Sequence, residues 1–314
     1  MIDPSLLKSW RIDMSHERPD ILIAGSPERS DFRMVIEDCR GELFVVEALS
    51  FKLRSRKRRI AEILEQLRLN GLMPVFPYRR DSKGSFLLEH EGYFWQVVPY
   101  LPGIQLDRPG YVFDLWRGES AANFLLEMRS AAPVIVEPAF SLPGYIEQLM
   151  AAIRRNRQDI SPQVDIMYNY VKDHLFPVYD KLPVCFAHGD FHAINIIWKE
   201  RGIAAVIDWE FCGLKPELYD AANMVSCLGI EDPECLWSGA PVSFLEHLRL
   251  SGKYAEISFR HFTDLMIAFR FAWLSEWLRK NDEEMIRMEF DYFDILSSLA
   301  RAGGQDGSSV QLFK

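Results

Sequence analysis

Short apolar runs separated by polar turns dominate the first hundred residues. Apolar residues gather at 21–24, 32–37 and 43–49, and the last two runs flank a polar turn containing Arg40 and Gly41. Two further runs, 85–90 and 93–100, flank a second turn at Glu91 and Gly92. Runs of this length around turn-forming residues are typical of β-hairpins. The pattern therefore predicts strands over most of this part of the chain.

Between these two hairpins, the spacing at residues 56–69 changes to that of a helix. A glycine at position 71 and a proline at position 74 mark where the helix ends. The apolar stripe of this predicted helix consists of Ile60, Ile63, Leu64 and Leu67.

The chain changes character after a Leu-Pro-Gly break at residues 101–103. Beyond it, two short apolar strands are expected at 184–187 and 204–207, around a polar loop. Helices are expected at 111–129, 142–157, 162–180, 218–229, 241–250, 254–280 and 283–301. The predicted fold class is α+β, without βαβ winding. It has a smaller lobe of sheet and one helix at 1–100 and a larger, mainly helical lobe at 101–314.

Composition and charge narrow the possible partners. The 314 residues include 36 basic and 45 acidic side chains, so the net charge is −9 and binding to nucleic acid is not expected. The five cysteines contain no CxxC pair, which favours a reducing compartment such as the cytoplasm. We expect no secretion signal and no membrane span, because no sufficiently long uncharged apolar run occurs.

The strongest chemical signal is the segment HGDFHAIN at residues 188–195, followed by VIDWE at 206–210. Phosphoryl transfer from a nucleotide needs a carboxylate that orients or deprotonates the acceptor hydroxyl, and oxygen ligands for Mg²⁺. Asp190 can supply the first function, and Asn195 with Asp208 can supply the second.

These paired motifs resemble the aminoglycoside phosphotransferase and choline kinase-like superfamily. Its pattern is H-G-D-x-H-x-x-N, then I-D-W/F, then a later D-x-A, which residues 220–222 supply here. The homoserine kinase-like and stress-response kinase branches fit equally well. The resemblance implies a bilobal protein-kinase-like fold, with ATP or GTP and Mg²⁺ as cofactors.

The resemblance also implies roles for individual residues. Asp190 would be the catalytic base or would position the hydroxyl, and His188 would belong to the same catalytic group as a brace for the loop. Asn195 and Asp208 would bind the metal, and Asp220 would hold the loop by hydrogen bonds. The nucleotide would contact the hinge at residues 97–100 and the following candidates: Gly25, Ser30, Arg33, Lys52, Glu62, Val98 and Tyr100.

Two features depart from the family pattern. Glu47 stands in the third strand where the family has a lysine or arginine, so a carboxylate would face the phosphates. Arg33 or Lys52 could replace that base, and Arg33 is preferred. Residues 25–30 contain one glycine instead of a glycine-rich phosphate loop. Glu62 is the expected helix partner of the phosphate-binding base, with Glu65 as the alternative.

Several other residues allow two interpretations each. His192 either packs in the loop or lines the site, and Glu210 is either a solvated carboxylate or part of the metal or substrate site. The aromatic residues at 269, 273 and 277 form either a core stripe or a cage for an amine. The basic cluster is either a solvated helix start or a patch for an acidic partner; it consists of Lys52, Arg54, Arg56, Lys57, Arg58 and Arg59.

The sequence thus predicts an ATP- or GTP-dependent, Mg²⁺-requiring kinase that acts on a hydroxyl of a small molecule. The net charge favours an amine-bearing acceptor, bound between the 188–195 loop and the helices of residues 230–300. Two alternatives stay open, a pseudokinase-like interaction module because of Glu47, and a Ser/Thr protein kinase of the stress-kinase branch. The oligomeric state is left open.

Overall fold

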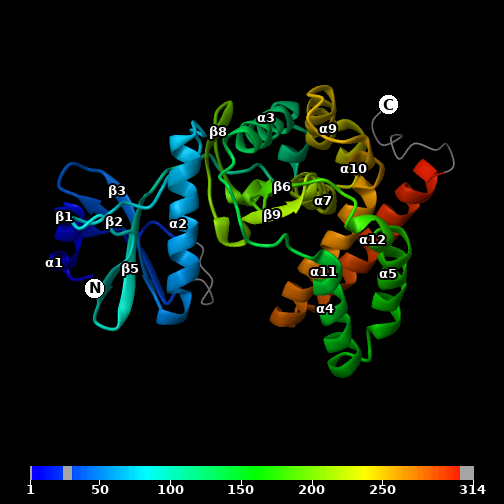
Figure 1. Cartoon of the computed structure of the whole chain (residues 1–314), viewed down its shortest axis with the longest axis horizontal. Coiled ribbons are helices and arrows are strands. Elements are labelled where there is room, and N and C mark those ends of the chain that lie inside the picture. Colours follow the sequence, from blue (N-terminus) through cyan, green and yellow to red (C-terminus); the bar gives the residue numbers. More distant parts are fainter. Residues whose placement is uncertain (1, 24–29, 305–314) are drawn as a thin grey trace.

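The computed structural model describes residues 2–23 and 30–304, with side chains described to residue 301. Figure 1 shows an antiparallel sheet at one end of the molecule and a larger, mainly helical part at the other. The expected α+β architecture, with a sheet-containing part and a larger helical part, is therefore confirmed. The lobe boundary at residues 100 and 101 stays a prediction.

The small part is a five-stranded antiparallel sheet in the order β1-β2-β3-β5-β4. Its strands are β1 (Met14–Glu17), β2 (Phe32–Asp38), β3 (Leu43–Leu49), β4 (Leu88–His90) and β5 (Tyr93–Pro99). The β2–β3 hairpin turns through Gly41, whose φ of +80° suits glycine. Its register places Arg33 opposite Glu47, and this pairing governs the electrostatics of the site.

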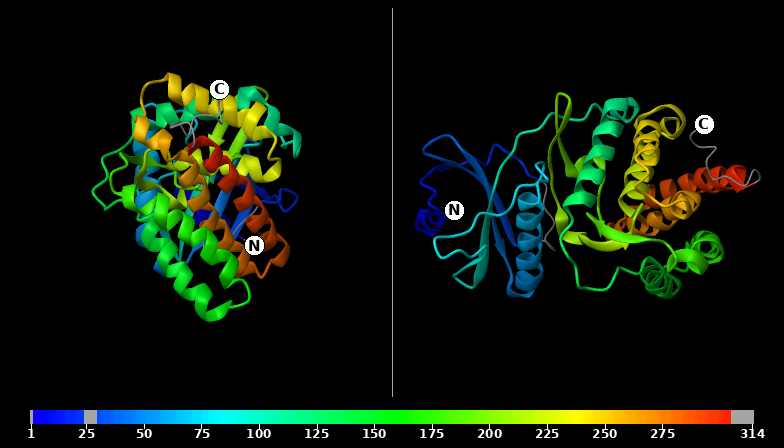
Figure 2. Two further views of the ribbon diagram at one scale, coloured as in Figure 1. Left: turned by 90° about the vertical axis from the view of Figure 1, so that its right-hand side faces the viewer. Right: turned by 45° about the horizontal axis from the view of Figure 1, so that its top comes forward.

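The sheet and helix α2 (Arg54–Leu69) contribute to two separate apolar clusters. One sheet face packs on the N-terminal segment, α1 (Pro4–Leu7) and η1 (Lys8–Trp10). The predicted stripe of α2, by contrast, lies in the large cluster together with residues of the helical part, including Phe186 and Trp209. Figure 1 and the right-hand view of Figure 2 show α2 between the sheet and the helical part. Helix α2 is therefore packed against the helical part.

The large part surrounds two small hairpin-like pairs of strands. Strand β6 (Val184–Ala187) pairs with β9 (Gly213–Pro216), and β7 (Ile196–Lys199) pairs with β8 (Gly202–Val206). Its longer helices are α3 (Leu115–Ala131), α4 (Leu142–Asn156), α5 (Ser161–His174), α7 (Tyr219–Glu231), α9 (Ala240–Leu250), α11 (Phe262–Lys280) and α12 (Glu283–Gly304). Its short ones are η3 (Gly110–Phe113), α6 (Phe176–Tyr179), η4 (Ala193–Asn195), η5 (Trp209–Phe211), α8 (Cys235–Ser238) and α10 (Glu256–Arg260).

Several predicted elements need correction. Residues 21–23 form no strand, and Leu22 is 92% exposed, so that apolar run has no core to pack on. The strands near 184 and 204 do not pair with each other, because each has a partner that the apolar pattern missed. The long helices expected at 162–180 and 254–280 are both interrupted. In the first, a separate helix, α6, begins at Phe176, with Pro177 in its first turn.

Helix α3 packs closely against α9, and Gly118 permits this approach. A Cβ at that position would lie 2.2 Å from the Ala240 carbonyl oxygen. No helix in the described ranges 2–23 and 30–304 has the length and apolar character needed to cross a membrane.

Candidate active site

The 188–195 loop begins where β6 ends and is tied to the start of α7. The backbone N–H groups of His188 and Gly189 donate to the two carboxylate oxygens of Asp220, at 2.6 and 2.8 Å. Asp220 is 3% exposed, and burial raises its pKa to about 6, against the effect of these two hydrogen bonds. This geometry is the bracing role that the resemblance implied for Asp220.

Gly189 lets the loop turn tightly beside the segment that follows Asp208. Its φ is +87°, and a Cβ there would lie 2.2 Å from the carbonyl oxygen of Phe211. Any other residue would meet both backbone strain and a steric clash. The glycine of the motif is therefore required by close backbone packing.

His188 is fully buried, and both of its ring nitrogens form hydrogen bonds to the backbone. Its Nδ1 accepts from the Asp190 backbone N–H at 3.2 Å, so Nε2 carries the proton and donates to the Ile207 carbonyl at 2.9 Å. Burial lowers the pKa of His188 to about 4, which keeps the ring neutral. His188 thus joins the loop to the strand that leads into Asp208, and its ring is placed for bracing.

Asn195 connects Asp190 to the second motif. Its Nδ2 donates to the Asp190 carbonyl at 2.9 Å and to Asp190 Oδ2 at 3.1 Å. Its own carbonyl accepts from the Ile207 N–H at 2.9 Å, which puts Asp208 next to it on the neighbouring segment. The structure therefore brings Asp190, Asn195 and Asp208 together.

The donor set at this junction suits a hard divalent cation. The Asn195 amide nitrogen is bonded to Asp190, so the side-chain oxygen is its remaining ligand atom, and Asp208 follows Ile207, the residue whose N–H donates to the Asn195 carbonyl. Asp208 has φ +66°, a left-handed conformation that is uncommon for aspartate. Within residues 2–23 and 30–304, no group of three or more His, Cys, Asp or Glu side chains is placed to hold a metal.

Aromatic side chains from α11 approach the other side of the loop. His192 Nε2 lies 3.6 Å from Asp190 Oδ1, and its ring contacts Trp273 edge-to-face at 5.5 Å. Trp273 stacks on Trp277 at 5.6 Å, whereas Phe269 is buried against Tyr219 in the core. Only the two half-buried tryptophans of the stripe remain candidates for an acceptor surface.

Asn223 lies beside these tryptophans, one turn after Asp220 on α7. Its Oδ1 faces Trp273 Nε1 at 3.4 Å, while its fully buried Nδ2 has no hydrogen-bond partner among the described residues. Trp277 donates to Glu289, which is paired with the buried Arg270. The wall next to the 188–195 loop is thus aromatic and polar.

On the sheet side, Arg33 and Glu47 neutralise each other. The Arg33 guanidinium contacts Glu47 Oε1 at 2.5 and 2.6 Å, and Gln96 Nε2 donates to the other oxygen at 2.5 Å. Glu47 is 1% exposed. The carboxylate that departs from the family pattern is therefore buried and paired.

The other predicted nucleotide contacts are placed differently. Ser30 is buried just before β2, while Lys52 is exposed in η2 (Phe51–Leu53). Gly25 lies outside the described residues. The Tyr100 N–H donates to the Leu43 carbonyl at 2.8 Å, and Val98 faces Val45 in the same ladder, so these backbone groups serve the sheet.

The expected helix carboxylates need correction. Glu62 is exposed and accepts from Arg58 one turn earlier, and Glu65 pairs with Arg80. Neither approaches the site, because both lie off the buried stripe of α2. The residue of α2 that does point at the site is Lys57, which is 2% exposed and paired with Glu210.

The sequence analysis placed Lys57 only within the basic cluster and did not single it out. The missed signal is its spacing, three residues before Ile60 and seven before Leu64, which continues the apolar stripe of α2. A lysine on such a stripe must find a buried partner.

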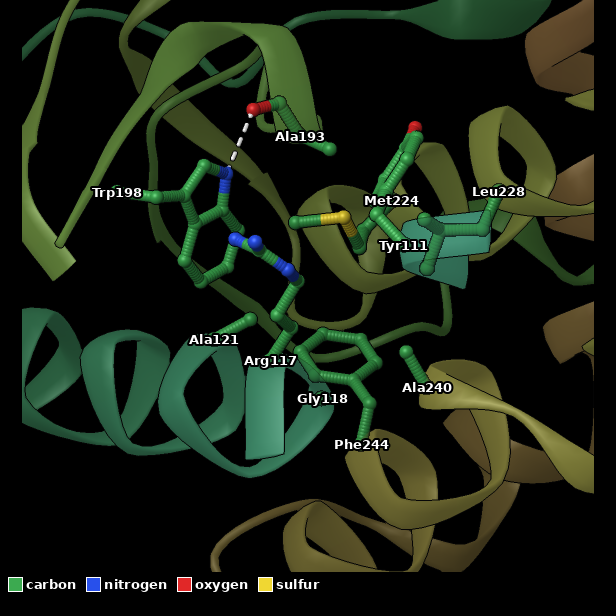
Figure 3. Close-up of a pocket in the computed structure, with 10 residues that line it drawn as sticks. All are labelled: Tyr111, Arg117, Gly118, Ala121, Ala193, Trp198, Met224, Leu228, Ala240 and Phe244. Carbon is green, nitrogen blue, oxygen red and sulfur yellow. Dashed lines mark hydrogen bonds between the residues drawn. The ribbon is translucent and has the colours of Figure 1, made fainter. Parts of the chain in front are cut away.

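A small cavity lies behind the loop, lined by Arg117, Trp198, Phe244 and neighbours on α3, α7 and α9 (Figure 3). Trp198 donates to the Ala193 carbonyl at 3.0 Å, and the Arg117 guanidinium lies 4.7 Å from the Trp198 ring. The cavity holds about 10 Å³, enough for roughly one water molecule. It is too small for a nucleotide or an acceptor.

The comparison with protein families decides the assignment. The model described as the phosphotransferase enzyme family matches residues 28–237, about two thirds of the chain, and this range includes Arg33, Glu47, Lys57, the 188–195 loop, Asp208 and Asp220. The chain belongs to the phosphotransferase enzyme family. It is therefore an enzyme, a phosphotransferase. No curated protein matches the chain.

Solved structures of phosphotransferases share its fold at low sequence identity. An amicoumacin kinase in complex with AMP-PNP, Ca²⁺ and Ami is 13% identical, with 94% of each chain covered and a TM-score of 0.65. The aminoglycoside phosphotransferase from Alicyclobacillus acidocaldarius is 12% identical, with 96% of this chain and 94% of that chain covered and a TM-score of 0.62. A spectinomycin phosphotransferase in complex with ADP and spectinomycin is 14% identical, with 93% and 92% covered and a TM-score of 0.58.

Proposed function

We propose that this phosphotransferase moves the γ-phosphoryl group of ATP or GTP, with Mg²⁺, to a hydroxyl of a small amine-bearing molecule. The observation that carries the proposal is the junction at which Asn195 donates to Asp190 and accepts from the N–H of Ile207, the residue directly before Asp208. It combines one carboxylate for the acceptor with amide and carboxylate oxygens for a metal, which are the parts that phosphoryl transfer requires.

In this proposal Asp190 orients the acceptor hydroxyl and accepts its proton as the oxygen attacks phosphorus. Asn195 fixes Asp190 through two hydrogen bonds, so the carboxylate needs little reorganisation. Asn195 and Asp208 would hold Mg²⁺, which neutralises charge on the phosphates when bound. His188 and Asp220 keep the loop in place from behind.

The hinge would read the base through backbone groups that the sheet leaves unused. Ladder hydrogen bonds alternate, and the amide of Tyr100 already faces β3. The carbonyl of Pro99 and the amide of Leu101 are therefore the proposed contacts, in place of Val98 and Tyr100. Backbone contacts of this kind accommodate either ATP or GTP.

The proposed acceptor site lies between Asp190 and the tryptophans of α11. Trp273 offers an aromatic surface next to His192 and Asp190, an environment that attracts a protonated amine. The net charge of −9 acts in the same direction. The related solved structures bind amicoumacin or spectinomycin, which supports a polar, hydroxyl-bearing small molecule as the acceptor class.

A turnover assay tests the proposal. The purified protein is incubated with Mg²⁺ and ATP or GTP, and a panel of amino alcohols, aminoglycosides and sugars is screened for a mass gain of one phosphoryl group. Phosphorylation of an amine-bearing acceptor by the wild type, absent in Asp190→Asn, is the expected result. Nucleotide binding with no acceptor turned over would favour the pseudokinase-like alternative, and phosphorylated protein alone would favour a protein kinase.

A further inference from the structure

Helix α2 meets the segment that begins at Asp208, residues 208–213. The charged residues around this junction are the reverse of those expected. The expected arrangement has a base on β3 and an acid on the helix. In the structure the acid, Glu47, is on β3, and the base, Lys57, is on α2. Lys57 Nζ contacts Glu210 Oε1, and the Glu210 side chain is only 7% exposed. A buried lysine and a buried glutamate thus face each other two residues beyond Asp208.

Two more basic residues of α2 contact the same segment. The Arg56 guanidinium donates to the Glu210 carbonyl at 2.8 Å, lies 3.1 Å from Glu210 Oε2 and sits over the Phe211 ring at 5.6 Å. Arg59 pairs with Glu137, and its Nη2 lies 3.5 Å from the place where a Cβ on Gly213 would stand. Glu210 is therefore bonded to the helix, and the residues after it pass close to the same helix face.

Helix α2 is a firm support for this segment because its apolar stripe packs in the core of the large part. Ile60, Leu64 and Leu67 belong to the same apolar cluster as Trp209, the residue that follows Asp208. The helix and the segment therefore share one core, and Lys57 adds a charged contact at the edge of that core. Asp208, in its left-handed conformation, lies directly before the segment that is held.

The phenol of Tyr78 feels the charges of both acidic residues of this region, Glu47 and Glu210. Burial raises its pKa well above the usual value, and the charges of Glu47 and then Glu210 raise it further. Arg33 neutralises Glu47, and Lys57 with Arg56 neutralises Glu210. Glu47 and Glu210 are thus neutralised by different basic residues, and those of Glu210 come from α2.

We propose that Lys57 is a positioning residue that acts through Glu210 to hold the segment carrying Asp208 in a metal-binding conformation. The inference rests on the proposed function in one respect, that Asp208 binds the metal. It gives three members of the basic cluster, Arg56, Lys57 and Arg59, a role between α2 and residues 210–213, in place of a solvated helix start.

The test compares Lys57→Met and Glu210→Gln with a matched control, Arg58→Met. Arg58 is the next residue on the helix, its side chain is 67% exposed, and its recorded ion pair is with Glu62. Hydrogen–deuterium exchange of a peptide covering residues 208–213 is measured without nucleotide or metal. We expect exchange to accelerate about tenfold or more in Lys57→Met and Glu210→Gln, and to stay within twofold of the wild type in the control.

A second measurement is the Mg²⁺ concentration that gives half-maximal nucleotide binding. It should rise about tenfold in Lys57→Met, recover in Lys57→Arg, and leave metal-free nucleotide binding within about threefold. If Lys57→Met does not fold, Glu210→Gln, which keeps the side-chain shape, gives the answer. Exchange and Mg²⁺ dependence matching the control in both variants would overturn the proposal. A wild type without Mg²⁺-dependent binding would instead refute the proposed function, while the exchange measurement would still report on Lys57.

Discussion

The 188–195 loop and the sheet side of the site differ in how their chemistry is encoded. In the loop, His188, Asp190 and Asn195 lie within eight consecutive residues, and hydrogen bonds inside the loop and to Asp220 fix their relative positions. On the sheet side, the charged groups come from β2, β3, α2 and the segment after Asp208. The residues of the loop match the family pattern because the turn needs those residue types. A charge network between distant elements stays neutral when the acidic and the basic residue change places, as they do on β3 and α2.

The comparison of the two regions predicts that substitutions in the 188–195 loop have the largest effects. Asp190→Asn keeps the size of the side chain and removes the proton acceptor. We expect turnover to fall about 10³–10⁴-fold with nucleotide affinity within threefold of the wild type. Steady-state kinetics measures the fall in turnover, and calorimetry measures the nucleotide affinity. Near-normal turnover in this variant would show that Asp190 is not the group that activates the acceptor.

The bracing of the loop predicts a pH effect on stability through His188. Its pKa is about 4 in the folded protein and about 6.5 when unfolded, so the neutral ring contributes stability that is present above pH 6.5 and lost as the pH falls towards 4. The loss between pH 7 and 4 should be about 3 kcal/mol.

The free energy of unfolding is best measured for the wild type and His188→Gln across this range. Asp220 titrates in the same window with the opposite sign, because its raised pKa of about 6 makes the folded state gain stability as the pH falls below 6. That contribution is common to both proteins and cancels in the difference. A difference that is constant from pH 7 to 4 would contradict a buried neutral His188.

On the sheet side, the account predicts a structural effect for Arg33. Arg33→Gln removes the cation that pairs with the buried Glu47 and leaves the hydrogen bond from Gln96, so it should reduce the free energy of unfolding by about 2–3 kcal/mol. The double variant Arg33→Gln/Glu47→Gln should recover most of this loss, as a double-mutant cycle in denaturant would show. Unchanged stability with lost nucleotide binding would instead place Arg33 on the phosphates.

The matched substitution in the same region is Lys52→Gln. Lys52 is exposed in η2, so unfolding free energy and nucleotide affinity should both stay close to those of the wild type. A large loss of nucleotide affinity in this variant would move the phosphate-binding role to Lys52.

The smallest effect is expected for Glu62. Its carboxylate is exposed and its ion pair with Arg58 spans one helical turn, so Glu62→Gln should change stability by less than about 0.5 kcal/mol. Nucleotide affinity, measured by calorimetry, should stay within twofold. A tenfold loss would return Glu62 to the site.

The residues of the 188–195 loop and the α+β fold class could be predicted from the sequence. Asn195 donates to Asp190 five residues earlier and accepts from Ile207, the residue before Asp208, so the spacing of the motifs along the chain carries most of the geometry. The apolar periods also predicted α2 and the strands of the sheet other than β1, whose residues Met14–Glu17 form no apolar run. In the large part β7 and β9 were missed, and β9 (Gly213–Pro216) likewise has no apolar run. The paired strands of the large part could not be read from apolar runs alone.

The sheet side could not be predicted because its contacts depend on packing between elements. Whether Arg33 reaches the phosphates or Glu47 depends on the register of the hairpin, since one residue of slip would turn it to the other face. The choice between Glu62 and Lys57 depends on which face of α2 is buried, and the charge of a residue does not reveal that. The family pattern predicted an acidic and a basic residue on β3 and α2. It did not predict that the acid would be on β3 and the base on α2.

The measurement that tests the central claim most directly is calorimetry of nucleotide binding with and without Mg²⁺, for the wild type and Asp208→Ala. The account predicts Mg²⁺-dependent binding of ATP or GTP by the wild type and loss of the Mg²⁺ dependence in Asp208→Ala. Absence of binding with either nucleotide, or the same Mg²⁺ dependence in both proteins, would contradict a phosphotransferase site built on Asp190, Asn195 and Asp208.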